Sequence, residues 1–223
     1  MGDIEVRLAR DDADRDAVGR ARFEVYCMRR GWLDPTDFPD GVERDAYDTH
    51  STHVLACDAA GPVGTVRLVH AGPHGFPIEQ AFERPPLSVL GIDAWDARVA
   101  EVSRLAVVRS ETPHVLFAAL VQVLYRHSIA NGITAWLTAT DANARRIAIE
   151  RLGIVSGQYA DAKDYCGSVT VPGVIVLERM MAHFAAERPA MHALFSSDWP
   201  ADEVVVRAAA ALESRGRPGS SAG

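Results

Sequence analysis

The sequence has no long hydrophobic run, and its first residues do not resemble a signal peptide. None of its apolar segments approaches the roughly 20 residues that a helix needs to cross a bilayer. The first residues, Met-Gly-Asp-Ile-Glu-Val, carry neither the basic flank nor the apolar core of a signal peptide. We therefore expect a cytoplasmic enzyme without stable membrane insertion.

Cysteine is scarce, and positive charge does not prevail. The three cysteines, Cys27, Cys57 and Cys166, are widely spaced and form no Cys-x-x-Cys pair, which argues against disulfides and structural zinc, and no metal site is predicted. The net charge of −7 argues against a nucleic-acid partner, because phosphate binding needs a basic field. A local basic patch that meets an acidic protein is compatible with this composition.

The chain of 223 residues does contain a clear succession of strand and helix patterns. Apolar residues recur with period two in the expected strands and on one stripe in the expected helices. Residues 71–97 are rich in Gly and Pro and predict a loop with one or two helical turns. Strands are predicted at residues 3–9, 51–57, 62–70, 98–108, 133–140 and 169–178, and helices at 13–31, 112–131, 141–153 and, broken by prolines, 180–215.

This order predicts an α+β fold in which helices flank a mixed, largely antiparallel central sheet. We assign one domain to residues 1–182 and a helical C-terminal extension to residues 183–215. Residues 216–223 are rich in Pro, Gly and Ser, and we expect this tail to be disordered.

An unusual acidic stretch lies at residues 42–48, in a long segment interrupted by Pro and Gly. It holds Glu43, Asp45 and Asp48 together with Tyr47. Carboxylates this dense repel one another unless water, cations or N–H groups hold them. We expect arginines that flank the stretch to pin it, so that it borders a functional site; the candidates are Arg22, Arg29, Arg67 and Arg104.

The predicted strand at residues 98–108 carries ionisable side chains in its centre. Strict alternation places Glu101 and Ser103 on one face and Arg104 on the other. Packing alone does not explain charged groups on both faces of a central strand.

Five short motifs, taken in order and spacing, resemble the acyl-homoserine-lactone synthases and N-acyl amino acid synthases of the GNAT acyltransferase superfamily. Variants at residues 25–27, 38–41 and 48–53 are closer to the N-acyl amino acid synthases, including exosortase-associated acyltransferases. The resemblance covers residues 5–110 well. In the remainder of the chain, only the order of the helices and strands is similar. The motifs are Arg-Phe-Glu-Val-Tyr-Cys (22–27), Gly-Trp (31–32), Glu-Arg-Asp-Ala-Tyr-Asp (43–48), Gly-Thr-Val-Arg-Leu (64–68) and Glu-Val-Ser-Arg-Leu-Ala-Val (101–107).

The resemblance implies a GNAT fold in which an acyl chain on acyl carrier protein passes to an amine. Ordinary GNAT proteins hold the diphosphate of coenzyme A with a glycine-rich turn, whereas residues 108–114 contain no glycine. We therefore expect acyl-phosphopantetheine of acyl carrier protein as the donor and no permanently bound cofactor. Positions that match the motifs are expected to line or brace the active site: Arg22, Tyr26, Trp32, Glu43, Asp45, Asp48, Arg67, Glu101 and Arg104.

The chemistry of thioester aminolysis suggests roles for two of these positions. The α-amine of an amino acid is mostly protonated at pH 7, so a general base should help. Glu101 is our candidate base, and Ser103 beside it is the second candidate catalytic residue. The alternative is that Glu101 forms a structural ion pair with an arginine. Backbone N–H groups of the strand could stabilise the oxyanion.

The other candidates each leave two interpretations open. Arg22, Arg67 and Arg104 either brace the acidic loop or bind the carboxylate of the acceptor. Trp32 and Tyr26 either contact substrate or close the core.

Two further residues are more typical of structure than of catalysis. His53 lies in a half-buried strand, where a hydrogen-bonded histidine is commoner than a base. Cys27 has no histidine placed to activate it, so a small buried residue is the simpler interpretation.

Basic residues gather on the two helices expected beside the acyl entry. We interpret them as a docking patch for the acidic acyl carrier protein, with ordinary solvated helix faces as the alternative. The patch comprises Arg126, His127, Arg145, Arg146 and Arg151.

The leading hypothesis is an N-acyltransferase that moves a fatty acyl group from acyl carrier protein to the amine of an amino acid and so forms an N-acyl amino acid. Three alternatives stay open: an acyl-homoserine-lactone synthase that uses S-adenosylmethionine, an enzyme that acylates a peptide amine, and a non-catalytic GNAT-like domain that binds lipid. Acyl length and acceptor depend on segments with little motif content, residues 71–97 and 154–185.

Overall fold

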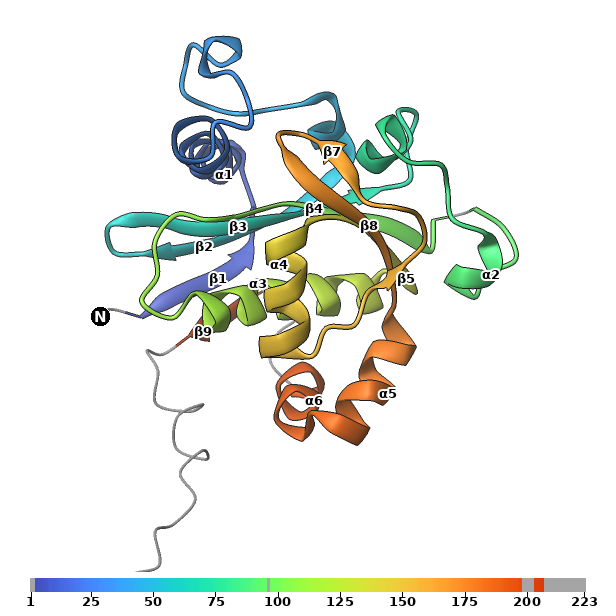
Figure 1. Ribbon diagram of the computed structural model, residues 1–223. Helices are drawn as coiled ribbons and strands as arrows, with labels where there is room; N and C mark the ends of the chain where they lie inside the picture. Colours follow the sequence, from blue (N-terminus) through green and yellow to red (C-terminus); the bar gives the residue numbers. More distant parts are fainter. Residues whose placement is uncertain (1–2, 96, 198–202, 207–223) are drawn as a thin grey trace, which may run out of the picture.

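Within the residues that the computed structural model describes, 3–95, 97–197 and 203–206, nine strands form one mixed sheet (Figure 1). The strand order is β6-β8-β5-β4-β3-β2-β1-β9, and β7 pairs with β8. The strands are β1 (Ile4–Leu8), β2 (Ser51–Asp58), β3 (Gly61–His70), β4 (Val99–Val107), β5 (Ala135–Asp141), β6 (Gly157–Gln158), β7 (Lys163–Tyr165), β8 (Ser168–Val176) and β9 (Glu203–Val206).

Helices cover both faces of this sheet. Figure 1 shows α1 above it, and α3, α5 and α6 below it. The predicted α+β fold with a largely antiparallel sheet is confirmed, since β4 and β5 are the one parallel pair among the described strands. The helices are α1 (Asp12–Phe23), α2 (Leu87–Leu90), α3 (Pro113–Ala130), α4 (Ala142–Ile147), α5 (Leu177–Glu187) and α6 (Pro189–Ser196).

The parallel pair is also where the sheet opens. β4 and β5 are paired from Val99 opposite Ala135 only as far as Val102 opposite Thr138. Beyond that point β4 continues alongside β3 and β5 continues alongside β8. The two central strands therefore separate toward their carboxyl ends and leave a gap in the middle of the sheet.

The two larger of three hydrophobic cores among the described residues lie on opposite faces of the sheet. The larger one packs α3, α5 and α6 against the sheet through side chains such as Trp136, Leu120 and Phe184, each of which is at most 1% exposed. The smaller one packs segment 76–92 against Val69 and Leu137 on the other face. None of the helices in the described part of the chain has the length and hydropathy to span a bilayer.

A β-bulge in β4 overturns the predicted side of Arg104. Thr65 of β3 lies opposite Ala106 and Arg67 opposite Ser103, so Arg104 and Leu105 together face the single residue Val66. Arg104 has a φ of 52°, in the left-handed region that non-glycine residues seldom adopt. The extra residue brings the Arg104 side chain to the same face as Ser103, and strict alternation failed because it assumes an unbroken strand.

The expected helix boundaries agree with the structure, with one refinement. Thr112 precedes Pro113 at the first turn of α3, and the Asp141 side chain caps α4. The first helix runs on as predicted toward Gly31, which has a φ of 61°, but its last part is a π-helix (Glu24–Arg29). A second π-helix (Ala148–Leu152) extends α4 to Gly153.

The C-terminal segment is only partly helical in the described residues. α5 and α6 are present, but Glu203–Val206 is a strand that pairs antiparallel with β1, so the helix predicted through residue 215 is wrong at this point. The proposed boundary between residues 182 and 183 falls inside α5. The predicted tail at 216–223 lies outside the described residues.

Candidate active site

A cavity of about 190 Å³ occupies the gap between β4 and β5. On the face that carries α1 it is lined by Tyr26, Trp32 and Glu101, and on the face that carries α3 by Phe117 and Trp136. The cavity thus connects the two faces of the sheet through the point where the central strands separate. A thioester group placed there would have its reacting carbonyl beside β4 and its chain among apolar side chains.

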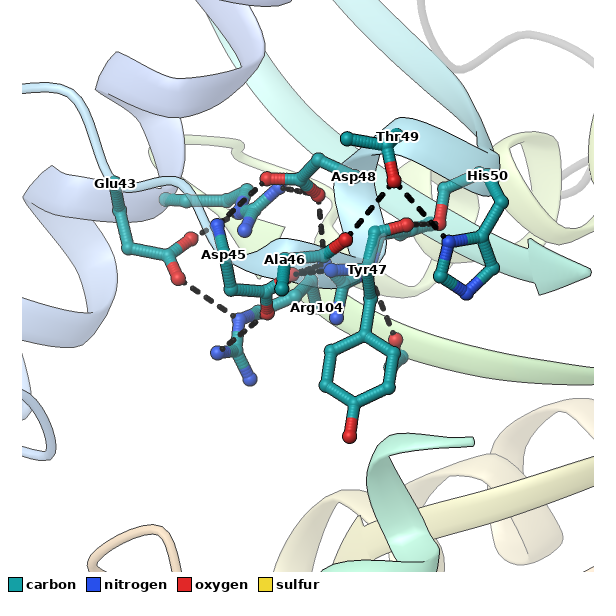
Figure 2. A network of polar contacts seen from close by, with 12 residues as sticks. Glu43, Asp45, Ala46, Tyr47, Asp48, Thr49, His50 and Arg104 are labelled. Atoms are coloured by element: carbon teal, nitrogen blue, oxygen red, sulfur yellow. Dashed lines mark hydrogen bonds and ion pairs between the residues drawn. The ribbon is translucent and has the colours of Figure 1, made fainter. Parts of the chain in front are cut away.

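The acidic loop is held by arginines, as expected. Three carboxylates and three guanidinium groups alternate in one network (Figure 2). The pairs are Arg22 Nε–Glu43, Arg22 Nη1–Asp48 at 2.9 Å, Arg67 Nη1–Asp45 and Arg67 Nη1–Asp48 at 2.6 Å each, and Arg104 Nε–Glu43 and Arg104 Nη2–Asp45 at 3.2 Å each.

Hydrogen bonds within the loop itself also fix its conformation. A 3₁₀ turn (Ala46–His50) follows Asp45, whose side chain accepts a hydrogen bond from the N–H of Tyr47 at 2.9 Å. The Asp48 side chain reaches back to the N–H of Asp45 at 2.9 Å, which completes a capping box. Asp48 therefore gives Oδ2 to the backbone and Oδ1 to Arg22 and Arg67. Asp45 Oδ1 accepts from both the Tyr47 N–H and Arg67, and its Oδ2 accepts from Arg104.

The network keeps Asp45 and Asp48 ionised despite their burial. Burial alone would raise the pKa of Asp48, but the charges of Arg22 and Arg67 hold this pKa well below its usual range. Burial would also raise the pKa of Asp45, but its hydrogen bond to Arg67 and the charges of Arg67 and Arg104 together lower it. Burial lowers the pKa of His53 to about 4, so this histidine is neutral at pH 7.

One predicted partner does not join the loop. Arg29 donates to Glu24 Oε1 at 2.9 Å and to the carbonyl oxygen of Val108. It lies at the end of the first helix and ties that helix to the segment after β4. The expectation that Arg29 pins the acidic stretch is therefore wrong.

Glu101 is sealed into the sheet at the cavity wall. Its side chain is 1% exposed and accepts a hydrogen bond from the N–H of Ile78 at 2.8 Å. Burial raises the pKa of its carboxyl to about 8, although the Ile78 N–H and the charges of Arg67 and Arg104 favour the ionised form. Glu101 has no ion pair within 4.0 Å among the described residues, so the predicted alternative of a structural ion pair has no support. A carboxyl with this pKa can exchange a proton with a reactant near neutral pH.

The raised pKa makes stability depend on pH. The unfolded carboxyl ionises near its ordinary pKa of 4.5, whereas the folded one retains its proton up to a pKa of about 8. Between these values only the folded state holds the proton, so the free energy of unfolding should fall by about 1.4 kcal/mol per pH unit. Glu101→Gln should remove this slope, and the variant should be more stable than the wild type at pH 8 but not at pH 5.

Urea unfolding at several pH values measures this difference. Glu187→Gln, at an exposed position of α5, is the matched control and should follow the wild type at every pH. If Glu101→Gln and Glu187→Gln gave the same dependence on pH, the carboxyl of Glu101 would not have a raised pKa.

Ser103 lies on the same face as Glu101 and is oriented by Arg67. The Nε of Arg67 donates to Ser103 Oγ at 3.1 Å. Because that oxygen already accepts a hydrogen bond from a cation, its own hydrogen is left to donate to another group. Ser103 also lines the cavity, so its hydroxyl can donate to the oxygen of a carbonyl that reacts there.

Tyr26 and Trp32 close the cavity on the α1 side. The Tyr26 hydroxyl donates to the carbonyl oxygen of Leu105 at 2.6 Å, and its ring lies 5.6 Å from that of Trp32. A Cβ added at Gly167 would lie 2.8 Å from the Trp32 ring, so the turn between β7 and β8 packs directly on this tryptophan. Both aromatic residues therefore pack in a hydrophobic core and also line the cavity.

The proposed docking residues do not form one exposed patch. Arg126 is only 9% exposed and donates to Ser197 Oγ at 3.1 Å, so it is unsuited to contact a partner. Arg145 lines the cavity and donates to the carbonyl oxygen of Ser156 at 2.9 Å. His127 is half-buried and shares the Thr52 hydroxyl with another histidine. Arg146 and Arg151 remain exposed.

The structure adds residues that the sequence analysis did not single out. Pro77 and Ile78, in a 3₁₀ turn (Pro77–Gln80), approach Glu101 from the second core. Tyr165 donates to the carbonyl oxygen of Pro77 at 2.8 Å and lines the cavity with Cys166. Their segments carry no motif, and a Cys-Gly pair between short strands is a weak turn signal.

The two residues that the sequence assigned a structural role differ in outcome. Cys27 is 6% exposed, and burial raises the pKa of its thiol, which makes it a poor nucleophile. His53 is buried as expected, but its Nε2 lies 3.7 Å from Asp48, and its Nδ1 has no hydrogen-bond partner among the described residues, so the expected hydrogen bond is not seen. Across residues 3–95 and 97–197, no group of three or more His, Cys, Asp or Glu side chains is arranged to hold a metal ion.

Comparison with known proteins is consistent with this geometry. The family model described as N-acyl amino acid synthase FeeM matches residues 17–176. An acyl-homoserine-lactone synthase of Aliivibrio fischeri (strain ATCC 700601 / ES114) is 27% identical over 136 residues, which are 58% of this chain and 66% of that protein. The matched region thus spans slightly less than two thirds of the length of this relative.

Solved structures share the fold at low sequence identity. The structure of FeeM, an N-acyl amino acid synthase from uncultured soil microbes, has a TM-score of 0.61 at 14% identity and covers 81% of this chain and 94% of that one. BjaI, described as a CoA-dependent acyl-homoserine lactone synthase, has a TM-score of 0.64 at 20% identity, with 84% and 85% coverage. The acyl-homoserine-lactone synthase LasI has a TM-score of 0.58 at 19% identity, with 78% and 89% coverage.

Proposed function

Because the chain belongs to the N-acyl amino acid synthase FeeM family, we propose that it transfers a fatty acyl group from acyl carrier protein to the amine of an amino acid. The protein is an acyltransferase of the group that includes the acyl-homoserine-lactone synthases. The observation that carries the finer proposal is the position of Glu101, a buried carboxyl with a pKa of about 8 on the wall of a cavity whose far half is apolar.

The proposed reaction needs no group beyond those at the cavity. The neutral amine of the acceptor attacks the thioester carbonyl through its nitrogen, and Glu101 takes the proton that this nitrogen loses as the carbon–nitrogen bond forms. Ser103 donates its hydroxyl hydrogen to the oxyanion of the tetrahedral intermediate. The carbon–sulfur bond breaks, and Glu101 returns the proton to the departing thiol. An amide and a free phosphopantetheine thiol result.

The arginines divide into braces and one candidate ligand for the acceptor. The side chains of Arg22 and Arg67 are 2% and 0% exposed, so their role is to hold the acidic loop. The Arg104 side chain is 18% exposed and lines the cavity. Arg104 is therefore the guanidinium best placed to meet the carboxylate of an amino acid.

The donor assignment rests on residues 108–114, which lack the glycines that would let a backbone approach a diphosphate closely. Acyl carrier protein presents only the single phosphate of its pantetheine arm. Docking of this partner remains a proposal for Arg146 and Arg151, the exposed members of the predicted patch.

Charge reversal tests the docking role. Arg146→Glu combined with Arg151→Glu should raise the KM for acyl carrier protein several-fold and leave the KM for acyl-pantetheine unchanged, because only the protein donor meets this surface. Steady-state kinetics with both donors make the comparison. An equal change in the two KM values would assign the effect to the active site instead.

Mass spectrometry of lipid extracts tests the function itself. Cells that express the wild type are compared with cells that express Glu101→Gln and with cells that carry an empty vector. A series of N-acyl amino acids in the first culture alone supports the proposal. An acyl-homoserine lactone would instead support the S-adenosylmethionine-dependent reaction, which the resemblance to the Aliivibrio fischeri synthase favours. The absence of any new lipid would favour a peptide acceptor or a lipid-binding role.

A further inference from the structure

Among the described residues, Glu101 accepts one hydrogen bond, and the donor is a backbone group. The N–H of Ile78 lies 2.8 Å from Glu101 Oε2. Burial raises the pKa of Glu101, and of the groups that oppose this effect the Ile78 N–H has the largest influence, ahead of the charges of Arg67 and Arg104. The proton affinity of the proposed base therefore depends on how this one peptide group is held.

The same peptide group is bound at its other end by Tyr165. The carbonyl of Pro77 and the N–H of Ile78 belong to one planar trans peptide unit, in which the two groups point in opposite directions. The Tyr165 hydroxyl donates to the Pro77 carbonyl oxygen at 2.8 Å. Tyr165, this peptide group and Glu101 thus form a chain of two hydrogen bonds, and both hydrogens are directed toward Glu101.

Hydrogen bonds that follow one another in a chain are mutually strengthening. A donor on the peptide oxygen polarises the peptide group and makes its N–H a better donor, by about 10–30% per bond. A better donor favours the ionised form of the carboxyl group. Burial raises the pKa of the Tyr165 hydroxyl, so Tyr165 keeps its hydrogen throughout the pH range in which Glu101 ionises.

The hydroxyl of Tyr165 and its ring have separate contacts. The ring packs edge-on against Phe82, with 6.3 Å between the ring centroids. The hydroxyl lies 2.8 Å from the Pro77 oxygen and 3.4 Å from Gln80 Oε1, so the bond to Pro77 is the better one. Gln80 in turn donates to the Tyr47 hydroxyl at 3.0 Å. Phenylalanine at position 165 would keep the ring contact and remove the hydrogen bonds.

We propose that Tyr165 is a positioning residue for the general base, because its hydroxyl acts on Glu101 through the peptide group between Pro77 and Ile78. The inference rests on the proposed acyl transfer, in which Glu101 takes a proton from the acceptor nitrogen. Tyr165 belongs to the hairpin of β7 and β8 and also lines the cavity. The hairpin is thereby connected to the proton chemistry at the centre of the sheet.

The other titratable groups that act on Glu101 come from four parts of the chain. Their charges are the same in the wild type and in Tyr165→Phe, so a difference between the two proteins reports the hydroxyl group. These groups are Arg67 of β3, Arg104 of β4, Glu79 of the 3₁₀ turn and Tyr159 between β6 and β7.

The dependence of kcat/KM on pH tests the proposal. Tyr165→Phe should move the midpoint of its rise to higher pH by about half a unit, because the Ile78 N–H becomes a poorer donor. At pH 7 kcat/KM should fall about threefold, and at pH 9.5 it should be nearly unchanged, since Glu101 is then ionised in both proteins. Ionisation of the acceptor amine affects both profiles equally. An unchanged midpoint in a folded Tyr165→Phe protein would overturn the proposal.

Two control variants separate this effect from a general disturbance. Gln80→Met changes an exposed residue of the same turn and leaves the bond from Tyr165 to Pro77 in place, so its midpoint should not rise. Tyr125→Phe removes a hydroxyl of α3 that has no hydrogen-bond partner in the described part of the chain, and its profile should match the wild type. An equal shift in Gln80→Met and Tyr165→Phe would show a loosened turn and contradict the proposal.

Carbon-13 NMR of the glutamate carboxyl groups separates this inference from the proposed function. The signal of Glu101 is the one that Glu101→Gln lacks, and its titration needs no substrate. If no thioester is consumed, the acyl-transfer proposal fails, and the NMR titration still decides whether Tyr165 acts on Glu101. A higher midpoint in Tyr165→Phe than in the wild type and Gln80→Met supports this action. The same midpoint in all three proteins overturns it.

Discussion

Replacing Glu101 by Gln is expected to lower kcat for acyl transfer by roughly 10²–10⁴-fold, the usual contribution of a general base. Glutamine retains the size of the side chain and an oxygen for the Ile78 N–H, but it cannot take a proton. In the wild type, kcat/KM should rise with pH up to about pH 8, since the carboxyl must be ionised to act and burial raises its pKa to about 8.

The experiment measures initial rates with acyl carrier protein thioesters from pH 5.5 to 9. Glu187→Gln serves as the control, because Glu187 lies exposed on α5 and is not among the residues that line the cavity. Circular dichroism and the urea midpoint show whether each variant is folded. A Glu101→Gln protein that is folded and retains full activity would remove Glu101 from the mechanism.

The second large effect is expected in the ion network. The side chains of Arg22 and Glu43 are 2% and 1% exposed, so removal of either partner leaves a buried charge with too few counter-charges. Arg22→Met should lower the free energy of unfolding by about 3–5 kcal/mol, and Glu43→Gln by a similar amount. The double variant should lose less free energy of unfolding than the sum of the two single variants, with a coupling energy of about 1–3 kcal/mol. The reason is that each single variant leaves one buried charge without its partner, whereas the double variant removes both charges of the pair.

Urea unfolding of the two single variants and the double variant gives this coupling energy. The matched control is the exposed pair of Arg146 in α4 and Glu150 in the π-helix that extends it, whose side chains are 59% and 54% exposed. An exposed pair of this kind should couple by less than about 0.5 kcal/mol. If the buried and exposed pairs coupled equally, the network would not stabilise the loop.

Loss of activity in the arginine variants needs separate interpretation. Arg22→Met removes a brace and should disturb the loop and its aspartates before it affects any substrate. Arg104 differs because its side chain is partly exposed on the cavity wall. A change in acceptor KM at unchanged stability would therefore identify contact with the acceptor at Arg104, whereas a brace should change both quantities.

The sequence by itself determined the features that depend on local chemistry. Alternating and helical apolar patterns, with Thr112-Pro113, Asp141 and Gly31 at helix ends, gave the order of elements, since these signals act over a few residues. Three carboxylates within seven residues required water, cations or N–H groups to hold them wherever the loop lay. The family and the arginines of the network followed from the same motifs.

Only the tertiary structure decided features that depend on strands and helices far apart in the chain. The bulge opposite Val66 placed Arg104 on the face of Ser103, and helix packing buried Arg126 while it left Arg146 exposed. The separation of β4 from β5 created the cavity, because pairing registers are set by the whole sheet. The acidic stretch could thus be identified from the sequence alone. The raised pKa of Glu101 could not, because it arises from complete burial, which depends on the packing of segments far apart in the chain.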